Sequence, residues 1–346
     1  MTHTITVQPS GKQFEADEGE TILAAAMREG IILPYGCRNG VCGSCKGKVV
    51  TGQLGYPEGL PAGITDEQSR GGDCLFCKAV AYGDATIEAP VAEGVANLEV
   101  RTMPCRVDRI EKLNHDVARL WLKLPKNDRL QFLAGQYLEF LLPENRKRAF
   151  SMANAPHDDD LIELHIRHVE GGLFTDQIFG TSDTAAGIRE KSVMRIRAPL
   201  GTFYLREDSA RPIILVAGGT GFAPIKGVME HALHSGIDRP IHLFWGVRQA
   251  ADLYLPELPV QWAQSHANVE YTPVLSDSPE GQWEGARGFV HEAVLAAYPD
   301  LSAHDVYMCG PPVMITSGRD SFIANGLPED RLYYDSFEYA AESEGK

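Results

Sequence analysis

The sequence predicts three consecutive domains of different fold class: a small α+β unit, an antiparallel β-barrel and a doubly wound parallel α/β sheet. Short strands and one helix surround a cysteine-rich loop near the N-terminus. Five or six short apolar segments separated by turn residues follow, and strands then alternate with helices to the end. We place the domains at residues 1–92, 104–206 and 207–346, with a linker at 93–103.

Length and charge limit the possible functions. The chain has 346 residues, 44% of them hydrophobic, which is enough for several cores. It shows neither an apolar run of membrane-spanning length nor a signal peptide, so we expect a cytoplasmic protein without membrane insertion. A net charge of −15 disfavours nucleic acid or an anionic membrane as a partner and fits either a docking site with a basic rim or a merely solvated exterior.

The first domain begins with two predicted strands and a helix. Residues 4–9 and 13–17 are typical of paired strands, and residues 20–30 have helical character. Thr21 is the expected N-cap and Gly30 the expected residue after the C-cap. A cysteine-rich loop follows this helix directly.

The cysteine-rich loop YGCRNGVCGSCKGKVV predicts an iron–sulfur centre. It places Cys37, Cys42 and Cys45 at C-x4-C-x2-C spacing, and its glycines allow backbone N–H groups to turn toward inorganic sulfides. This is the spacing of plant-type 2Fe–2S ferredoxins, and the strand, strand, helix and loop order is similar to their β-grasp fold. A second CxxC pair, Cys74 and Cys77, offers the fourth ligand.

The choice of fourth ligand stays open between the two later cysteines. The first cysteine of the ferredoxin pattern CxAYxxxDxTIE aligns with Cys77, which we predict as the ligand. The 31-residue interval from Cys45 to Cys77 is longer than usual, so Cys74 remains the alternative ligand. A zinc ribbon built from the two CxxC pairs would leave Cys37 without a role. A disulfide framework is disfavoured because the cysteine count of seven is odd and no secretory signal is present.

The second domain contains two short motifs that resemble those of the ferredoxin–NADP reductase flavoprotein superfamily. They are Arg148, Ala149, Phe150 and Ser151 in RAFS, and Gly171, Gly172 and Thr175 at a strand-to-helix turn. The resemblance implies FAD binding, with the arginine at the pyrophosphate, the serine at the flavin N5 edge and the turn at phosphate. A guanidinium suits paired phosphate oxygens. Phe150 replaces the family's tyrosine, so we expect FAD to lose one hydrogen bond.

The third domain carries two motifs at the ends of predicted parallel strands. They are GGTGFAP, with Gly218, Gly219, Thr220, Gly221 and Pro224, and CGPP, with Cys309, Gly310 and Pro311. Glycines permit close approach to a pyrophosphate, and ligands bind in the crevice at the switch point of such sheets. The same superfamily carries this pair, which implies that Cys309 lies beside the nicotinamide C4. In isolation Cys309 reads as a buried core thiol.

Two further segments bear on the nucleotide. The segment WGVRQAADLYLPE offers Arg248 as its only cation, followed by Asp252 and Glu257, which favours NADH over NADPH because a 2′-phosphate needs cationic partners. Near the C-terminus, in DSFEY, Phe337 is the predicted cover of the flavin face, with Tyr339 as the alternative.

Across nearly its whole length the chain resembles the ferredoxin/FAD/NAD reductases of bacterial oxygenases, and among them the CDP-6-deoxy-Δ3,4-glucoseen reductase type. The segments TMPCRVDRI, FLAGQY, FSMANAP, AGGTGFAP, GFVHEAVL and YYDSF carry this resemblance. It implies an NADH-dependent oxidoreductase with Cys309 and Ser151 as catalytic residues. Nicotinamide releases two electrons together and a 2Fe–2S cluster accepts one, so a flavin must stand between them.

The expected partner is an electron-accepting protein, either a CDP-6-deoxyhexose dehydratase or an oxygenase or hydroxylase component. Two other functions are possible. A free-standing NADH:flavin reductase or diaphorase would not need the fused metal loop, and an electron carrier with a merely structural nucleotide domain would not need the paired motifs of the second and third domains.

Overall fold

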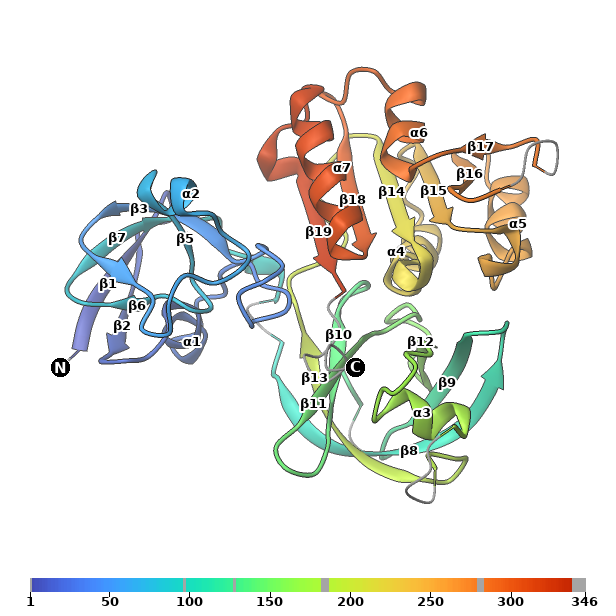
Figure 1. Cartoon of the computed structure of the whole chain (residues 1–346), viewed down its shortest axis with the longest axis horizontal. Coiled ribbons are helices and arrows are strands. Elements are labelled where there is room, and N and C mark those ends of the chain that lie inside the picture. The colour runs from blue at the N-terminus through green and yellow to red at the C-terminus, as the bar shows by residue number, and fades with distance from the viewer. Residues whose placement is uncertain (1, 96–97, 127–128, 182–186, 279–282, 338–346) are drawn as a thin grey trace. The chain divides into compact units, whose positions relative to one another are not determined.

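The computed structural model describes residues 2–95, 98–126, 129–181, 187–278 and 283–337 (Figure 1). The chain forms two compact units. The first comprises Met1–Leu98 with Gly201–Phe203, and the second comprises Glu99–Leu200 with Tyr204–Lys346. The second unit contains both the predicted barrel and the predicted nucleotide domain.

The first unit is built on a five-stranded mixed sheet in the order β2-β1-β7-β3-β5. Its central strands β1 and β7 run parallel, and the other pairs are antiparallel. The elements are β1 (Thr2–Gln8), β2 (Lys12–Asp17), α1 (Ile22–Arg28), β3 (Lys46–Thr51), β4 (Leu54–Gly55), α2 (Asp66–Arg70), β5 (Asp73–Leu75), β6 (Val80–Ala81), β7 (Ala85–Glu88) and η1 (Glu93–Val95). This arrangement confirms the predicted β-grasp.

Helix α1 begins and ends as its sequence predicts. The Thr21 hydroxyl accepts a hydrogen bond from the Ala24 N–H at 3.3 Å, and Gly30 has a φ of 74°, the left-handed conformation that glycine adopts without strain. Its apolar side packs into the core of the unit, where Ile22 and Leu23 join the strand residue Ile5. The helix thus ends at the start of the cysteine loop.

The second unit begins with a six-stranded antiparallel sheet in the order β11-β10-β13-β8-β9-β12. An isolated bridge between Met152 and Leu164 joins the two edge strands and closes the barrel. The elements are β8 (Arg101–Lys112), β9 (Val117–Lys123), β10 (Tyr137–Leu141), β11 (Lys147–Ser151), β12 (Ile162–Arg167), α3 (Thr175–Phe179) and β13 (Val193–Leu200). Five or six apolar segments were predicted here, and six strands form the barrel.

The rest of the second unit is a six-stranded parallel sheet in the order β17-β16-β15-β14-β18-β19. Its elements are β14 (Ile213–Gly218), η2 (Gly219–Gly221), α4 (Phe222–His234), β15 (Ile241–Val247), η3 (Ala250–Asp252), α5 (Glu257–Ser265), β16 (Val269–Leu275), β17 (Ala286–Arg287), α6 (Val290–Ala297), β18 (Asp305–Gly310), α7 (Pro312–Ala324), η4 (Glu329–Arg331) and β19 (Leu332–Ser336). The strand order reverses between β14 and β18, as in doubly wound sheets (Figure 1). Within the described residues, every helix is too short or too polar to cross a bilayer.

Candidate functional site

The loop between α1 and β3 gathers three of the predicted cluster cysteines. The thiols of Cys37 and Cys42 are hydrogen-bonded to each other, and Cys37 Sγ also accepts from the backbone N–H groups of Asn39 at 3.5 Å and Cys42 at 3.4 Å. The hydrogen bond from Cys42 and these backbone donors lower the pKa of Cys37 to about 5. The thiolate is the form that binds metal, so the loop favours the binding form of Cys37.

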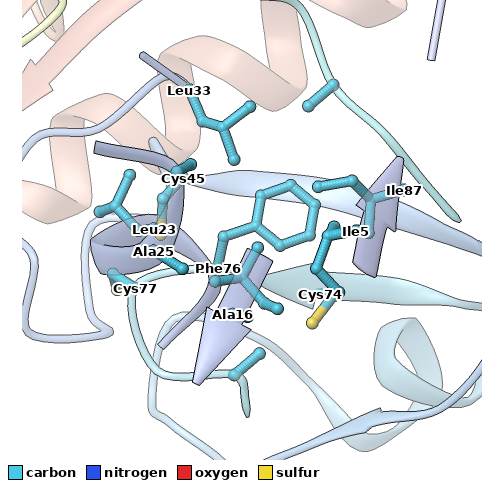
Figure 2. Packing of buried hydrophobic residues seen from close by; sticks show 14 of the residues in the cluster. Ile5, Ala16, Leu23, Ala25, Leu33, Cys45, Cys74, Phe76, Cys77 and Ile87 are labelled. Carbon is cyan, nitrogen blue, oxygen red and sulfur yellow. The ribbon is translucent and has the colours of Figure 1, made fainter. Parts of the chain in front are cut away.

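The two candidate fourth ligands occupy different surroundings. The thiol of Cys77 is hydrogen-bonded to that of Cys45, and this contact lowers the pKa of Cys77 with help from the Gly40 backbone. Cys74 instead lies 3.6 Å from the Tyr56 hydroxyl, and burial raises its pKa to about 11. Figure 2 shows Cys74 on the opposite side of Phe76 from Cys45 and Cys77. The Cys74 thiol therefore contacts Tyr56, whereas the Cys77 thiol contacts Cys45.

The cysteines form two thiol pairs, Cys37 with Cys42 and Cys45 with Cys77. Each iron of a 2Fe–2S cluster takes two protein ligands in addition to the bridging sulfides, so two pairs suit this cluster. A structural zinc ion needs four ligands around one point. The donor set fits a 2Fe–2S cluster better than zinc.

The RAFS motif forms the end of β11. Its last residue, Ser151, pairs with Tyr137 of β10 and is 7% exposed, whereas Ala149 is exposed. Phe150 packs on Phe174 with ring centroids 5.2 Å apart, so an apolar ring contact stands where the family has a tyrosine. Arg148 is half-buried on the same strand.

The second barrel motif is a tight turn that leads into α3. Gly171 has a φ of 76°, and a Cβ on Gly172 would lie 2.6 Å from the Thr175 hydroxyl oxygen. That hydroxyl donates to the Val169 carbonyl at 2.9 Å and accepts from the Val169 N–H at 3.2 Å. The side chain of Thr175 therefore holds the turn in shape, and α3 is only five residues long.

A cavity of about 490 Å³ lies at the carboxyl ends of the parallel strands. The predicted cofactor-binding residues of the third domain that line it are Gly218, Gly219, Thr220, Arg248, Pro311 and Phe337, the last of which was predicted to cover the flavin face. The predicted residues outside this lining are Gly221, Pro224, Cys309 and Gly310. The Phe337 N–H donates to the Gly310 carbonyl at 2.9 Å, which fixes Phe337 at the cavity edge. The alternative Tyr339 lies outside the described residues.

Cys309 and Gly221 meet directly below this cavity lining. Cys309 is fully buried, and burial together with the charge of Asp335 raises the pKa of its thiol well above the usual range. A Cβ on Gly221 would lie 1.9 Å from the Cys309 carbonyl oxygen. Only glycine permits this approach, so the two motifs GGTGFAP and CGPP are locked together at the switch point.

Sequence reasoning missed residues that the barrel contributes to the cavity. Arg167 donates from Nε to Asp116 Oδ2 at 2.7 Å, and both residues line the cavity. A Cβ on Gly219 would lie 3.2 Å from an Arg167 guanidinium nitrogen, so this cation sits beside the glycine loop. Arg248, the predicted cation, lies 3.6 Å from Asp277 and is 75% exposed. The only sequence signal for Arg167 was its place four residues before Gly171.

Comparison with known proteins assigns each part of this architecture. Family models match residues 5–82 as a 2Fe-2S iron-sulfur cluster binding domain, 104–204 as an oxidoreductase FAD-binding domain and 215–320 as an oxidoreductase NAD-binding domain. The CDP-6-deoxy-L-threo-D-glycero-4-hexulose-3-dehydrase reductase of Yersinia pestis is 37% identical over 337 residues, which cover 97% of this chain and 99% of the relative.

Two further proteins show the same full-length likeness. The phenol 2-monooxygenase reductase component DmpP of Pseudomonas sp. (strain CF600) is 34% identical over 353 residues, 100% of this chain and 97% of the relative. The crystal structure of the Amycolatopsis cytochrome P450 reductase GcoB matches with a TM-score of 0.76 at 30% identity, covering 97% of this chain and 99% of that one.

The fold and the site define an iron–sulfur flavoprotein oxidoreductase with cluster, FAD and NAD domains in one chain. The chain belongs to the ferredoxin–NAD(P) reductase family whose members carry a 2Fe–2S ferredoxin domain. The predicted fold class, the family resemblance and the three cofactors are confirmed. The enzyme transfers electrons from a nicotinamide nucleotide to a partner protein.

Proposed function

We propose that this reductase takes electrons from NADH and delivers them singly to a sugar dehydratase or to an oxygenase component. The proposal rests on the two thiol pairs of the first unit, Cys37 with Cys42 and Cys45 with Cys77, as the site of a one-electron cluster. A free-standing flavin reductase needs no such one-electron outlet. The two acceptor classes come from the printed names of the relatives, which include a dehydrase reductase and a monooxygenase reductase component.

The proposed ligands of the cluster are Cys37, Cys42, Cys45 and Cys77. Cys37 is supported by its low pKa and by the backbone donors around it. Cys77 is supported over Cys74 by its contact with the Cys45 thiol. Cluster ligation needs reduced cysteines, and none of the seven, all of them in the described part of the chain, forms a disulfide, so we propose that the enzyme works in the cytoplasm.

In the second unit, the proposed flavin contacts are Arg148 to Ser151 on β11 and the turn at Gly171, Gly172 and Thr175. When bound, FAD accepts a hydride and releases its electrons one at a time. Arg148 offers a guanidinium for the pyrophosphate, and Ser151 presents a buried hydroxyl at the strand end. Phe150 contributes packing through Phe174.

The proposed nucleotide site is the cavity between the glycine loop and Phe337. Gly218, Gly219 and Thr220 line it beside Arg167, which adds a cation for the pyrophosphate. Asp252, also at the cavity, and Asp277, next to Arg248, would repel a 2′-phosphate, which supports the preference for NADH. Cys309 shapes this site from behind, through its contact with Gly221.

Anaerobic stopped-flow spectroscopy tests the route. With NADH in slight excess, flavin absorbance should bleach first and cluster absorbance should follow. Flavin bleaching with a cluster that stays oxidised would instead indicate a diaphorase, and an absence of any bleaching would indicate a carrier. The acceptor is tested by adding a purified dehydratase of the hexulose-3-dehydrase class, or an oxygenase component, to the reduced enzyme. Reoxidation of the cluster by one of them identifies the acceptor class.

A further inference from the structure

A buried lysine attaches helix α4 to the chain segment that continues the flavin strand. Lys226 lies in the second turn of α4 and is 5% exposed. Its ammonium donates to the Ala153 carbonyl at 3.2 Å, to Glu163 Oε2 at 3.1 Å and to Glu230 Oε2 at 2.9 Å. An ammonium has three donors, so these three acceptors satisfy the buried charge completely.

The acceptor segment, Met152–Asn154, is itself held rigidly against β12. The Ala153 N–H donates to the Glu163 carbonyl at 2.8 Å, and Asn154 Oδ1 accepts from the Glu163 N–H at 2.9 Å. This segment follows Ser151 directly, and Ser151 is the residue placed at the flavin. Movement of the segment would therefore move the proposed flavin contact with it.

A glycine brings the same helix against the same segment independently of any charge. A Cβ on Gly227 would lie 3.0 Å from the Asn154 carbonyl oxygen and 3.3 Å from the Met152 carbonyl oxygen. Both distances are shorter than ordinary van der Waals contact. The backbone of α4 thus approaches Met152–Asn154 as closely as the absence of a side chain permits.

Glu163 stays ionised at neutral pH. Burial alone would raise the pKa of Glu163, but the hydrogen bond from His165 and the charge of Lys226 lower it to about 2. A buried ion pair adds little net stability compared with an apolar pair, whereas its geometry is specific and the loss of one partner leaves an uncompensated charge. An ion pair that adds little stability but has a specific geometry is suited to fixing the separation between α4 and the segment Met152–Asn154.

We propose that Lys226, Glu163 and Gly227 are positioning residues that set the separation between the nicotinamide and the flavin. Helix α4 begins directly after the glycine loop Gly219–Gly221, and the segment Met152–Asn154 begins directly after the flavin strand β11. The contact between α4 and this segment therefore joins the nucleotide-binding loop to the flavin strand over fewer than ten residues of chain on each side. A misplacement of about 1 Å between reacting groups can slow a reaction by about 100-fold. This inference rests on the proposed function.

The test compares Lys226→Met with the neutral double variant Lys226→Met/Glu163→Gln and with Gly227→Ala. Lys12→Met, which breaks an exposed pair with Glu93 in the first unit, and Gly83→Ala, where a Cβ meets nothing within 4 Å, are the matched controls. Four quantities are measured for each holoenzyme: the limiting rate of flavin reduction, the NADH dissociation constant, the FAD and cluster content, and hydrogen exchange in Met152–Asn154.

We expect the limiting rate to fall by about 10- to 100-fold in Lys226→Met, with the NADH dissociation constant changed by less than about threefold. Hydrogen exchange in Met152–Asn154 should increase, and FAD and cluster content should match the controls. The double variant should regain part of the lost thermal stability, because the buried Glu163 carboxylate is neutralised and only the more exposed Glu230 is left without the lysine, while its limiting rate stays low. Gly227→Ala should slow the reaction with every charge retained.

Recovery of the rate together with stability in the double variant, or a parental rate in Gly227→Ala, would overturn the proposal, because the junction would then be merely structural. Gly227→Ala decides the question even where Lys226→Met fails to accumulate. Parental enzyme that NADH does not reduce would overturn the proposed function itself, which is visible before any variant is compared.

Discussion

The cluster loop and the nucleotide cavity are built in different ways. Three of the four proposed cluster ligands lie within nine consecutive residues, Cys37 to Cys45, on one loop of the first unit. The cavity of the second unit is lined by residues from β9, β12, the glycine loop, β15, α6, α7 and Phe337 directly after β19. A site made by one loop depends on local spacing, whereas an assembled site depends on how distant segments approach one another. Substitutions should therefore act locally in the first region and through packing in the second.

The largest effect is expected where a proposed ligand is lost. Cys77→Ser should abolish the electron paramagnetic resonance signal of the reduced cluster, because the pair with Cys45 loses one thiolate. Cys74→Ser should keep the signal, since its thiol contacts Tyr56 on the other side of Phe76. The opposite pattern would reverse the assignment of the two residues.

The next largest effect on activity should come from the close contact between Gly221 of GGTGFAP and Cys309 of CGPP. Gly221→Ala places a methyl group 1.9 Å from the Cys309 carbonyl oxygen, so the loop or β18 must move. We expect the rate of flavin reduction by NADH to fall by about 100-fold. Cluster content should not change, because the first unit folds around its own core. Loss of the cluster in this variant would contradict the separation of the two regions.

A smaller effect is expected at the thiol beside this contact. Cys309→Ala should slow hydride transfer by about tenfold, equivalent to about 1.4 kcal/mol, because truncation of a fully buried side chain leaves a cavity at the residue whose carbonyl contacts Gly221. Bound FAD and cluster content should stay near parental values. Flavin reduction at the parental rate would return Cys309 to the role of a core thiol.

The smallest effect concerns the exposed cation of the cavity. We expect kcat/KM with ferricyanide as acceptor to be at least about tenfold higher for NADH than for NADPH. Arg248→Ala should lower the value for NADPH by a few-fold, since an exposed arginine already facing Asp277 contributes little. Equal values for the two nucleotides would contradict the expected preference for NADH. The contribution of Arg248 to NADPH binding would then be the first to re-examine.

The same contrast explains how far the sequence could predict the molecule. The fold class and the caps of α1 follow from local periodicity and from Thr21 and Gly30, and the structure confirms them. The cluster loop was equally evident because its ligands are close in sequence. Arg167 and Asp116 were missed because they reach the cavity only through the approach of the barrel to the parallel sheet.

The junction at Lys226 was missed for the same reason. Its partners Ala153 and Glu163 precede it by 73 and 63 residues, and no motif relates them. Cys309 and Gly221 were identified from their motifs, but sequence alone did not show that Cys309 lies outside the cavity lining and that its carbonyl oxygen approaches Gly221. Physical contact between distant segments is the information that local patterns lack.

The central claim is that the cluster loop and the nucleotide cavity can be impaired separately. The most direct test compares the reduction of two electron acceptors by the Cys77→Ser enzyme. Ferricyanide can take electrons from reduced flavin, whereas the partner protein, or cytochrome c in its place, is expected to take them from the cluster. We predict that the variant retains NADH-dependent ferricyanide reduction within about twofold of the parental rate and loses at least about 90% of cytochrome c reduction, a tenfold change in rate. Equal loss of both activities, or retention of both, would contradict the account.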